Sequence, residues 1–135
     1  MTENEQQNER EAAIAWSKEQ LDVAIDELGK LGIVDGPSVE GRPVWMLPFK
    51  VLIAEIRETG QKRRALWVIT GDVPTDHIDE RLAETARDAA RHFSLKWQMH
   101  AARQVPTAAD AAIGRDLADQ AEALMSLVES DEAWT

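Results

Sequence analysis

The fourteen residues from Leu66 to Asp79, LWVITGDVPTDHID, constrain the fold of this chain more than any other stretch. Residues 65–70 alternate so that both faces of a strand carry apolar side chains, which is typical of a strand inside a sheet. Gly71 lets the chain leave the strand, and Pro74 favours a turn. A helix is expected to start at Thr75. We therefore predict a buried strand, a tight turn and a helix start in direct succession.

Two further strands are predicted upstream of this stretch. Residues 42–47 form a short apolar segment between Gly41 and Pro48, and residues 49–58 form a longer one with an apolar centre. The connections between the predicted strands are short, and short connections join antiparallel neighbours. The sequence therefore predicts a three-stranded antiparallel sheet.

Helices are predicted on both sides of this β region. Apolar side chains recur at helical spacing over residues 9–31, 75–103 and from 107 onwards. The residues of these stripes are Ile14, Leu21, Ala24, Ile25, Leu28 and Leu31 in the first helix, Ile78, Leu82, Ala86, Ala89, Phe93 and Trp97 in the second, and Ile113, Leu117, Ala121, Leu124 and Val128 in the third.

The predicted order is α-β-β-β-α-α, an α+β fold in which helices cover one face of a three-stranded antiparallel sheet. A length of 135 residues suits a single domain, residues 1–135. Residues 1–8 and about 130–135 are expected to be flexible, because they offer little that can pack.

Composition narrows the classes of function. The chain has no cysteine, which excludes thiolate nucleophiles and Cys-ligated metal centres. Its net charge is −10, with acidic residues concentrated toward both ends. Such a chain is repelled by nucleic acid and anionic lipid. The charge either serves solubility alone or favours another protein, with a basic surface, as the partner. No signal peptide or membrane span is recognisable, and a cytoplasmic location is expected.

Asp72, Asp76 and His77 form the candidate chemical site, just after the end of a predicted strand. Carboxylates and an imidazole can bind a divalent ion or act as an acid–base pair. The same residues also have structural explanations, since Asp and Thr cap helices and glycine and proline form turns. No known metal-binding spacing, nucleophile motif or phosphate loop is present, so no catalytic residue, metal ligand or cofactor is assigned.

The chain has five tryptophans and no tyrosine, and three of the tryptophans are candidate binding residues. Most of the five are expected to be core residues. Trp45 and Trp67 lie on predicted strands, where an exposed indole would form a docking surface. Trp134 lies in the acidic tail and is the strongest candidate for a contact with a partner.

The string that runs from Trp67 to Asp76, WVITGDVPTD, together with FSLKWQ at Phe93 to Gln98, resembles a family of small bacterial proteins catalogued as a domain of unknown function. The resemblance spans most of the chain and implies a stand-alone bacterial cytoplasmic protein. It implies no activity, cofactor or catalytic residue.

These observations favour a small acidic protein-interaction module without catalytic activity, of the immunity-like or adaptor kind. A homodimeric secretion chaperone is the first alternative, because such chaperones are also small and acidic. An enzyme that uses Asp72, Asp76 and His77, with a metal or as an acid–base pair, is the second.

Overall fold

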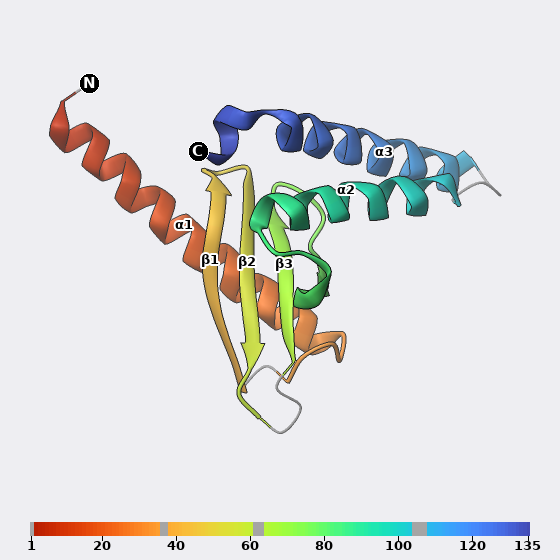
Figure 1. Ribbon diagram of the computed structural model, residues 1–135, viewed down its shortest axis with the longest axis horizontal. Helices are drawn as coiled ribbons and strands as arrows, with labels where there is room; N and C mark the ends of the chain where they lie inside the picture. Colours follow the sequence, from red (N-terminus) through yellow and green to blue (C-terminus); the bar gives the residue numbers. More distant parts are fainter. Residues whose placement is uncertain (1, 36–37, 61–63, 104–107) are drawn as a thin grey trace. The chain divides into compact units, whose positions relative to one another are not determined.

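The computed structural model describes residues 2–35, 38–60, 64–103 and 108–135. Within these residues the chain is an α+β protein with three α-helices and one four-stranded antiparallel sheet, which confirms the predicted class (Figure 1). The elements are α1 Glu3–Lys30, β1 Val39–Leu47, β2 Val51–Glu58, β3 Ala65–Gly71, β4 Asp76–Asp79, the 3-10 helix η2 Glu80–Leu82, α2 Ala86–Ala102, α3 Ala108–Glu129 and the 3-10 helix η3 Asp131–Trp134.

The chain divides into two compact units, Met1–Glu80 and Arg81–Thr135. The first unit contains α1 and the sheet. The second contains α2, α3 and η3. Each unit is described below by itself.

The sheet has the order β1-β2-β3-β4, so the prediction of three strands was wrong. Residues Asp76–Asp79, which were expected to begin a helix, pair antiparallel with β3 instead. Ile78 lies opposite Trp67 and is buried, whereas its polar neighbours are only partly buried. A four-residue strand is too short to show a recognisable alternation in the sequence, and only its pairing with β3 makes it a strand.

The next α-helix begins ten residues after the start of β4, at Ala86. Thr85 is its N-cap, and the Thr85 hydroxyl accepts a hydrogen bond of 3.1 Å from the backbone N–H of Asp88. The predicted start at Thr75 was therefore wrong. Ile78 belongs to β4, and Leu82 is 56% exposed, so neither contributes to a buried helix stripe.

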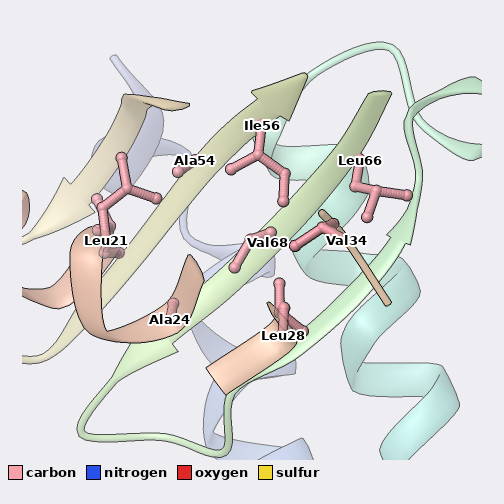
Figure 2. Close-up of a cluster of buried hydrophobic side chains, with 9 residues drawn as sticks. Leu21, Ala24, Leu28, Val34, Ala54, Ile56, Leu66 and Val68 are labelled. Atoms are coloured by element: carbon pink, nitrogen blue, oxygen red, sulfur yellow. The ribbon is translucent and has the colours of Figure 1, made fainter. Parts of the chain in front are cut away.

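Helix α1 packs on one face of the sheet and forms the core of the first unit with it (Figure 2). Alternation along β2 and β3 directs one set of their side chains toward this helix, as the antiparallel register requires. The buried cluster contains Leu21, Ala24, Leu28, Val34, Leu52, Ala54, Ile56, Leu66 and Val68. The opposite face of β2 and β3 carries Ile53, Trp67 and Ile69, which are buried as well.

The N-terminal part of α1 differs from the rest of the helix. The helix begins at Glu3, capped by the Thr2 hydroxyl, rather than at residue 9, so residues 3–8 are helical. Residues 3–12 are all exposed, and the first buried residue is Ala13. This projecting segment, residues 3–12, extends past β1 in Figure 1. Ile14 and Leu31 were predicted to lie on the buried stripe of this helix but are 48% and 67% exposed.

In the second unit, α2 and α3 form an antiparallel pair. The Ser94 hydroxyl donates to the carbonyl oxygen of Ala121 over 2.7 Å, and the Arg87 Nε donates to that of Val128 over 2.8 Å. The predicted stripe of α2 is confirmed at Ala86, Ala89, Phe93 and Trp97, and that of α3 at Ala121, Leu124 and Val128, all of which are buried. Ile113 of the predicted α3 stripe and the predicted helix start at residue 107 lie outside the residues whose side chains are described.

Within the described parts of the chain, no helix has the length and apolar character that crossing a membrane requires.

Candidate interaction surface

The structure places Asp76 and His77 next to each other on β4 but directs them to opposite faces of the sheet. Asp76 lies opposite Ile69 and His77 opposite Val68, and consecutive strand residues alternate between faces. The His77 Nδ1 is 3.9 Å from the Asp76 Oδ1, and that same oxygen accepts a 2.7 Å hydrogen bond from the His77 backbone N–H. Among the described residues, no group of three or more His, Asp and Glu side chains is arranged to hold a metal ion.

Asp72 is exposed and contributes to the fold through its backbone. Its N–H donates to the carbonyl oxygen of Lys50 over 2.8 Å, which ties the end of β3 to the turn between β1 and β2. Gly71 has φ +115°, and a Cβ added there would lie 2.7 Å from the Lys50 oxygen and 3.3 Å from Trp16. The Gly-Asp pair that stands out in the sequence therefore supports the neighbouring turn.

The three candidate tryptophans lie in different environments. Trp67 is 2% exposed and belongs to the core. Trp45 is half-buried on edge strand β1, opposite Ile53. Trp134 is half-buried in η3, where its indole N–H donates to the carbonyl oxygen of Leu127 over 2.9 Å. Trp45 and Asp76 share one face of the sheet but lie on strands at its opposite edges.

The turn between β1 and β2 has a feature that the sequence did not reveal. Phe49 has φ +65° and is the single non-glycine residue with positive φ among those described. The Lys50 N–H donates to the Leu47 carbonyl oxygen over 3.0 Å, with Pro48 as the second residue and Phe49 as the third. This is the pattern of a type II turn, whose third position normally requires glycine. A bulky residue there is strained, and such strain is typical of functional positions.

The Phe49 side chain is held in a defined place although it is 50% exposed. Its ring packs against the half-buried Trp16 of α1, with the ring centroids 5.7 Å apart and the planes at 52°. Leu47 and Val44 of β1 are each 41% exposed. An exposed apolar side chain fixed by a second aromatic ring is a suitable anchor for a partner.

A groove of about 540 Å³ lies between this turn and the start of α1. Its lining, called the helix–turn groove below, consists of Gln6, Glu9, Arg10, Ala13, Pro48 and Phe49. Gln6 and Ala13 lie about one turn before and after the adjacent pair Glu9 and Arg10, so the four residues form one face of α1. The groove therefore combines an apolar floor with a polar helical wall.

A second cavity, of about 530 Å³, lies at the other end of the first unit and includes Glu58 and Arg64. Glu58 is 5% exposed, and its carboxylate pairs with the Arg64 guanidinium at 3.0 Å. The same guanidinium donates to the Ile33 carbonyl oxygen over 2.6 Å. These contacts join the loop after α1 to the ends of β2 and β3, so the two charged groups have a structural role.

Sequence reasoning missed the groove because its two walls are distant in the chain. The available signal was the Leu-Pro-Phe-Lys string between two predicted strands, with proline at the favoured second position of a turn and an aromatic residue where glycine is usual.

Comparison of the whole chain with known proteins identifies its family but no function. Searches of curated proteins and of solved structures returned no match. The model of one family, described as a domain of unknown function (DUF4826), matches residues 9–134, which is nearly the whole chain. The chain therefore belongs to the DUF4826 family.

Proposed function

We propose that this protein is an interaction module that binds another protein through the helix–turn groove and does not catalyse a reaction. The main support is the conformation of Phe49. Its aromatic side chain is half-exposed, and its backbone has a conformation that glycine would adopt more easily. Selection for folding alone favours glycine at such a position. Phenylalanine at this position is explained if its exposed ring contacts a partner as well as Trp16.

The projecting segment of α1 supports the same proposal. Ten residues of helix without buried side chains gain little from tertiary packing, and short helices are marginal in water. A partner that packs along this segment would supply the missing stabilisation. The segment and Phe49 border the same groove, so one partner can contact both.

The free edge of β1 favours binding in the groove over the addition of a strand to the sheet. Pro43 has no N–H to donate, and the register between Pro43 and Trp45 is interrupted by a bulge. Both features discourage edge-to-edge pairing of strands. Immunity-like and adaptor proteins are the classes that fit a small acidic module of this kind.

Cross-linking in the native host tests the proposal. The full chain carries an affinity tag and is compared with Phe49→Gly, which keeps the turn, and with Val23→Ser, which removes another exposed apolar side chain of the same unit, 57% exposed on α1. We expect one protein to be recovered in a stoichiometric amount by the original chain and by Val23→Ser, and to be lost with Phe49→Gly.

Recovery that does not depend on Phe49, or no recovery at all, would contradict the proposal. Light scattering of the purified chain separates a foreign partner from a second copy. A dimer that Phe49→Gly converts to a monomer would identify the second copy as the occupant and would favour the homodimeric chaperone.

A further inference from the structure

Helix α2 has a second face that its pairing with α3 leaves exposed. Ala89, Phe93 and Trp97 are buried on one side of the helix. On the opposite side Leu95 is 47% exposed and Met99 is 59% exposed. Two large apolar side chains one turn apart on an exposed face are typical of a helix that packs against another helix.

Polar residues continue this row at both ends. Steps of three or four positions place five residues on one line along the helix, called the outer stripe below: Asp88, His92, Leu95, Met99 and Arg103. Arg103 is the C-cap and keeps a helical backbone conformation, with φ −91° and ψ −9°, so it stays in line with the others. The outer stripe is therefore acidic at its start, apolar in its middle and basic at its end.

This order of charges is self-complementary. When two copies of a helix pack antiparallel, the start of each lies against the end of the other. Asp88 of one copy then faces Arg103 of the other, and the pair occurs twice because the contact has two-fold symmetry. The Asp88 Oδ1 accepts a 3.1 Å hydrogen bond from Arg91, and a carboxylate has a second oxygen for a further cation. A parallel arrangement would instead bring like charges together.

The balance of charge also distinguishes this face from the rest of the chain. The whole chain carries a net charge of −10, which opposes the approach of a second copy. The acidic and basic ends of the outer stripe cancel each other. Two copies can therefore meet along this stripe without local repulsion.

The shape of the same face repeats the complementarity. A groove of about 430 Å³ lies beside the start of the outer stripe, and Leu82, His92 and Leu95 contribute to its lining. In the antiparallel register that joins the two charged ends, Met99 of the second copy lies opposite His92. Met99 is exposed, and an unbranched methionine side chain adapts to an irregular hollow. Each copy thus has a groove at one end of the stripe and a side chain that can fill it at the other.

We infer that two copies of this protein associate through the outer stripe of α2, packed antiparallel. Met99 of each copy lies in the groove beside His92 of the other, and an Asp88–Arg103 pair closes each end. The interface consists of residues of the second unit alone and shares no residue with the helix–turn groove. The inference therefore goes beyond the proposed function and gives a dimer that carries two grooves.

Light scattering of the full chain over a range of concentrations tests this inference. We expect a dimer, and we expect Met99→Lys to weaken it by about tenfold or more, because an apolar contact is lost twice and two charges are brought into the interface. Val23→Lys is the matched control, since it makes the same change in charge at a residue of α1 that is 57% exposed. We expect this control to weaken the dimer by less than about twofold at physiological salt, where screening is effective.

An exchange of charges tests the antiparallel register. Asp88→Arg and Arg103→Asp each place like charges at both ends of a dimer of their own kind. We expect either variant alone to associate about fivefold or more weakly than the original chain. An equimolar mixture of the two restores opposite charges at both ends, and we expect it to form a mixed dimer. A mixture that stays monomeric would overturn the antiparallel pairing.

The remaining outcomes separate this inference from the proposed function. A chain that stays monomeric at the highest concentration it tolerates, or a dimer that Met99→Lys leaves intact, would overturn the inference. A dimer that is lost with Phe49→Gly and kept with Met99→Lys would also overturn it, because the helix–turn groove would then hold the second copy. Cross-linking of a foreign partner through Phe49 would stand even if the chain were a monomer.

Discussion

Two turns of the first unit, one between β1 and β2 and one after β3, both contain a residue with positive φ. In the turn after β3 that residue is Gly71, which adopts φ +115° without a side-chain clash. In the turn between β1 and β2 it is Phe49, at φ +65°. The turn after β3 has glycine, the residue that this backbone conformation prefers, whereas the turn between β1 and β2 has phenylalanine. On this comparison we propose that the Gly-Asp string serves the fold, whereas Phe49 serves an interaction surface.

The two turns also contact each other, and the turn after β3 supports the turn between β1 and β2. Gly71 allows the chain to approach the Lys50 carbonyl oxygen, and the Asp72 N–H donates to that oxygen. The side-chain carboxylate of Asp72 takes no part in these contacts. What appeared in the sequence as a possible active site therefore positions the strained turn beside it.

The largest expected effect comes from Gly71→Ala. The new Cβ would lie 2.7 Å from the Lys50 oxygen, in a backbone conformation that alanine rarely adopts. We expect a loss of about 2–4 kcal/mol in the free energy of unfolding, from overpacking and backbone strain together. Urea denaturation measures this loss as a lower midpoint.

Gly32→Ala is the matched control for that variant. Gly32 has φ +74°, but a Cβ there meets no atom within 4 Å. Strain alone should lower the stability by about 1 kcal/mol. If the two variants lose equal stability, the close approach between Gly71 and Lys50 does not matter.

The next largest effect separates the strain at Phe49 from the contacts of its ring. Phe49→Ala removes the ring but keeps a Cβ, and Phe49→Gly removes both. We expect the glycine variant to be more stable than the alanine variant by about 1–2 kcal/mol, the cost of the left-handed conformation for an L-residue. Thermal and urea unfolding of the two proteins measure the difference, and an alanine variant of equal stability would show that the turn is not strained.

A smaller effect is expected at the base of the turn after β3. The hydroxyls of Thr70 and Thr75 are hydrogen-bonded at 2.8 Å, and Thr70 is 3% exposed. Thr70→Val should cost about 1 kcal/mol through loss of this bond. A double-mutant cycle with Thr75→Val isolates the interaction, and strictly additive losses would show that the two hydroxyls do not interact.

The smallest effect is expected at Asp72. Its side chain is exposed, and its backbone N–H makes the contact with Lys50. Asp72→Ala should change the free energy of unfolding by less than about 0.5 kcal/mol. Two results would instead indicate that the carboxylate binds a ligand. One is a larger loss of stability, and the other is a change in stability on adding Mg²⁺, Ca²⁺, Mn²⁺ or Zn²⁺ that this variant abolishes.

The sequence predicted the elements whose signal is long and periodic. The strand pattern of β2 and β3, the α2 stripe from Ala86 onward and the described part of the α3 stripe agree with the structure, since many residues contribute to each period. The wrong predictions concern segments that are short or that do not pack against the sheet. β4 has four residues, and the projecting segment has no apolar stripe by which its helix could be recognised.

The arrangement of the candidate site residues depends on strand pairing, which the sequence alone does not show. Asp72, Asp76 and His77 are close in sequence, but strand alternation separates Asp76 from His77, and Asp72 is used through its backbone. Trp67 is buried on a face of the sheet where Ile53, Ile69 and Ile78 are buried as well. Proximity along the chain was therefore a poor guide to proximity of functional groups.

By itself the sequence determined the α+β class, the acidic charge and the absence of cysteine chemistry, because these follow from local periodicity and composition. Only the tertiary structure decided that β4 is a strand, that Trp16 holds Phe49, and that the start of α1 faces the turn between β1 and β2. Each of these depends on contacts between residues far apart in the chain or on pairing with a neighbouring strand. Such contacts form only when the whole unit folds, so no local pattern encodes them.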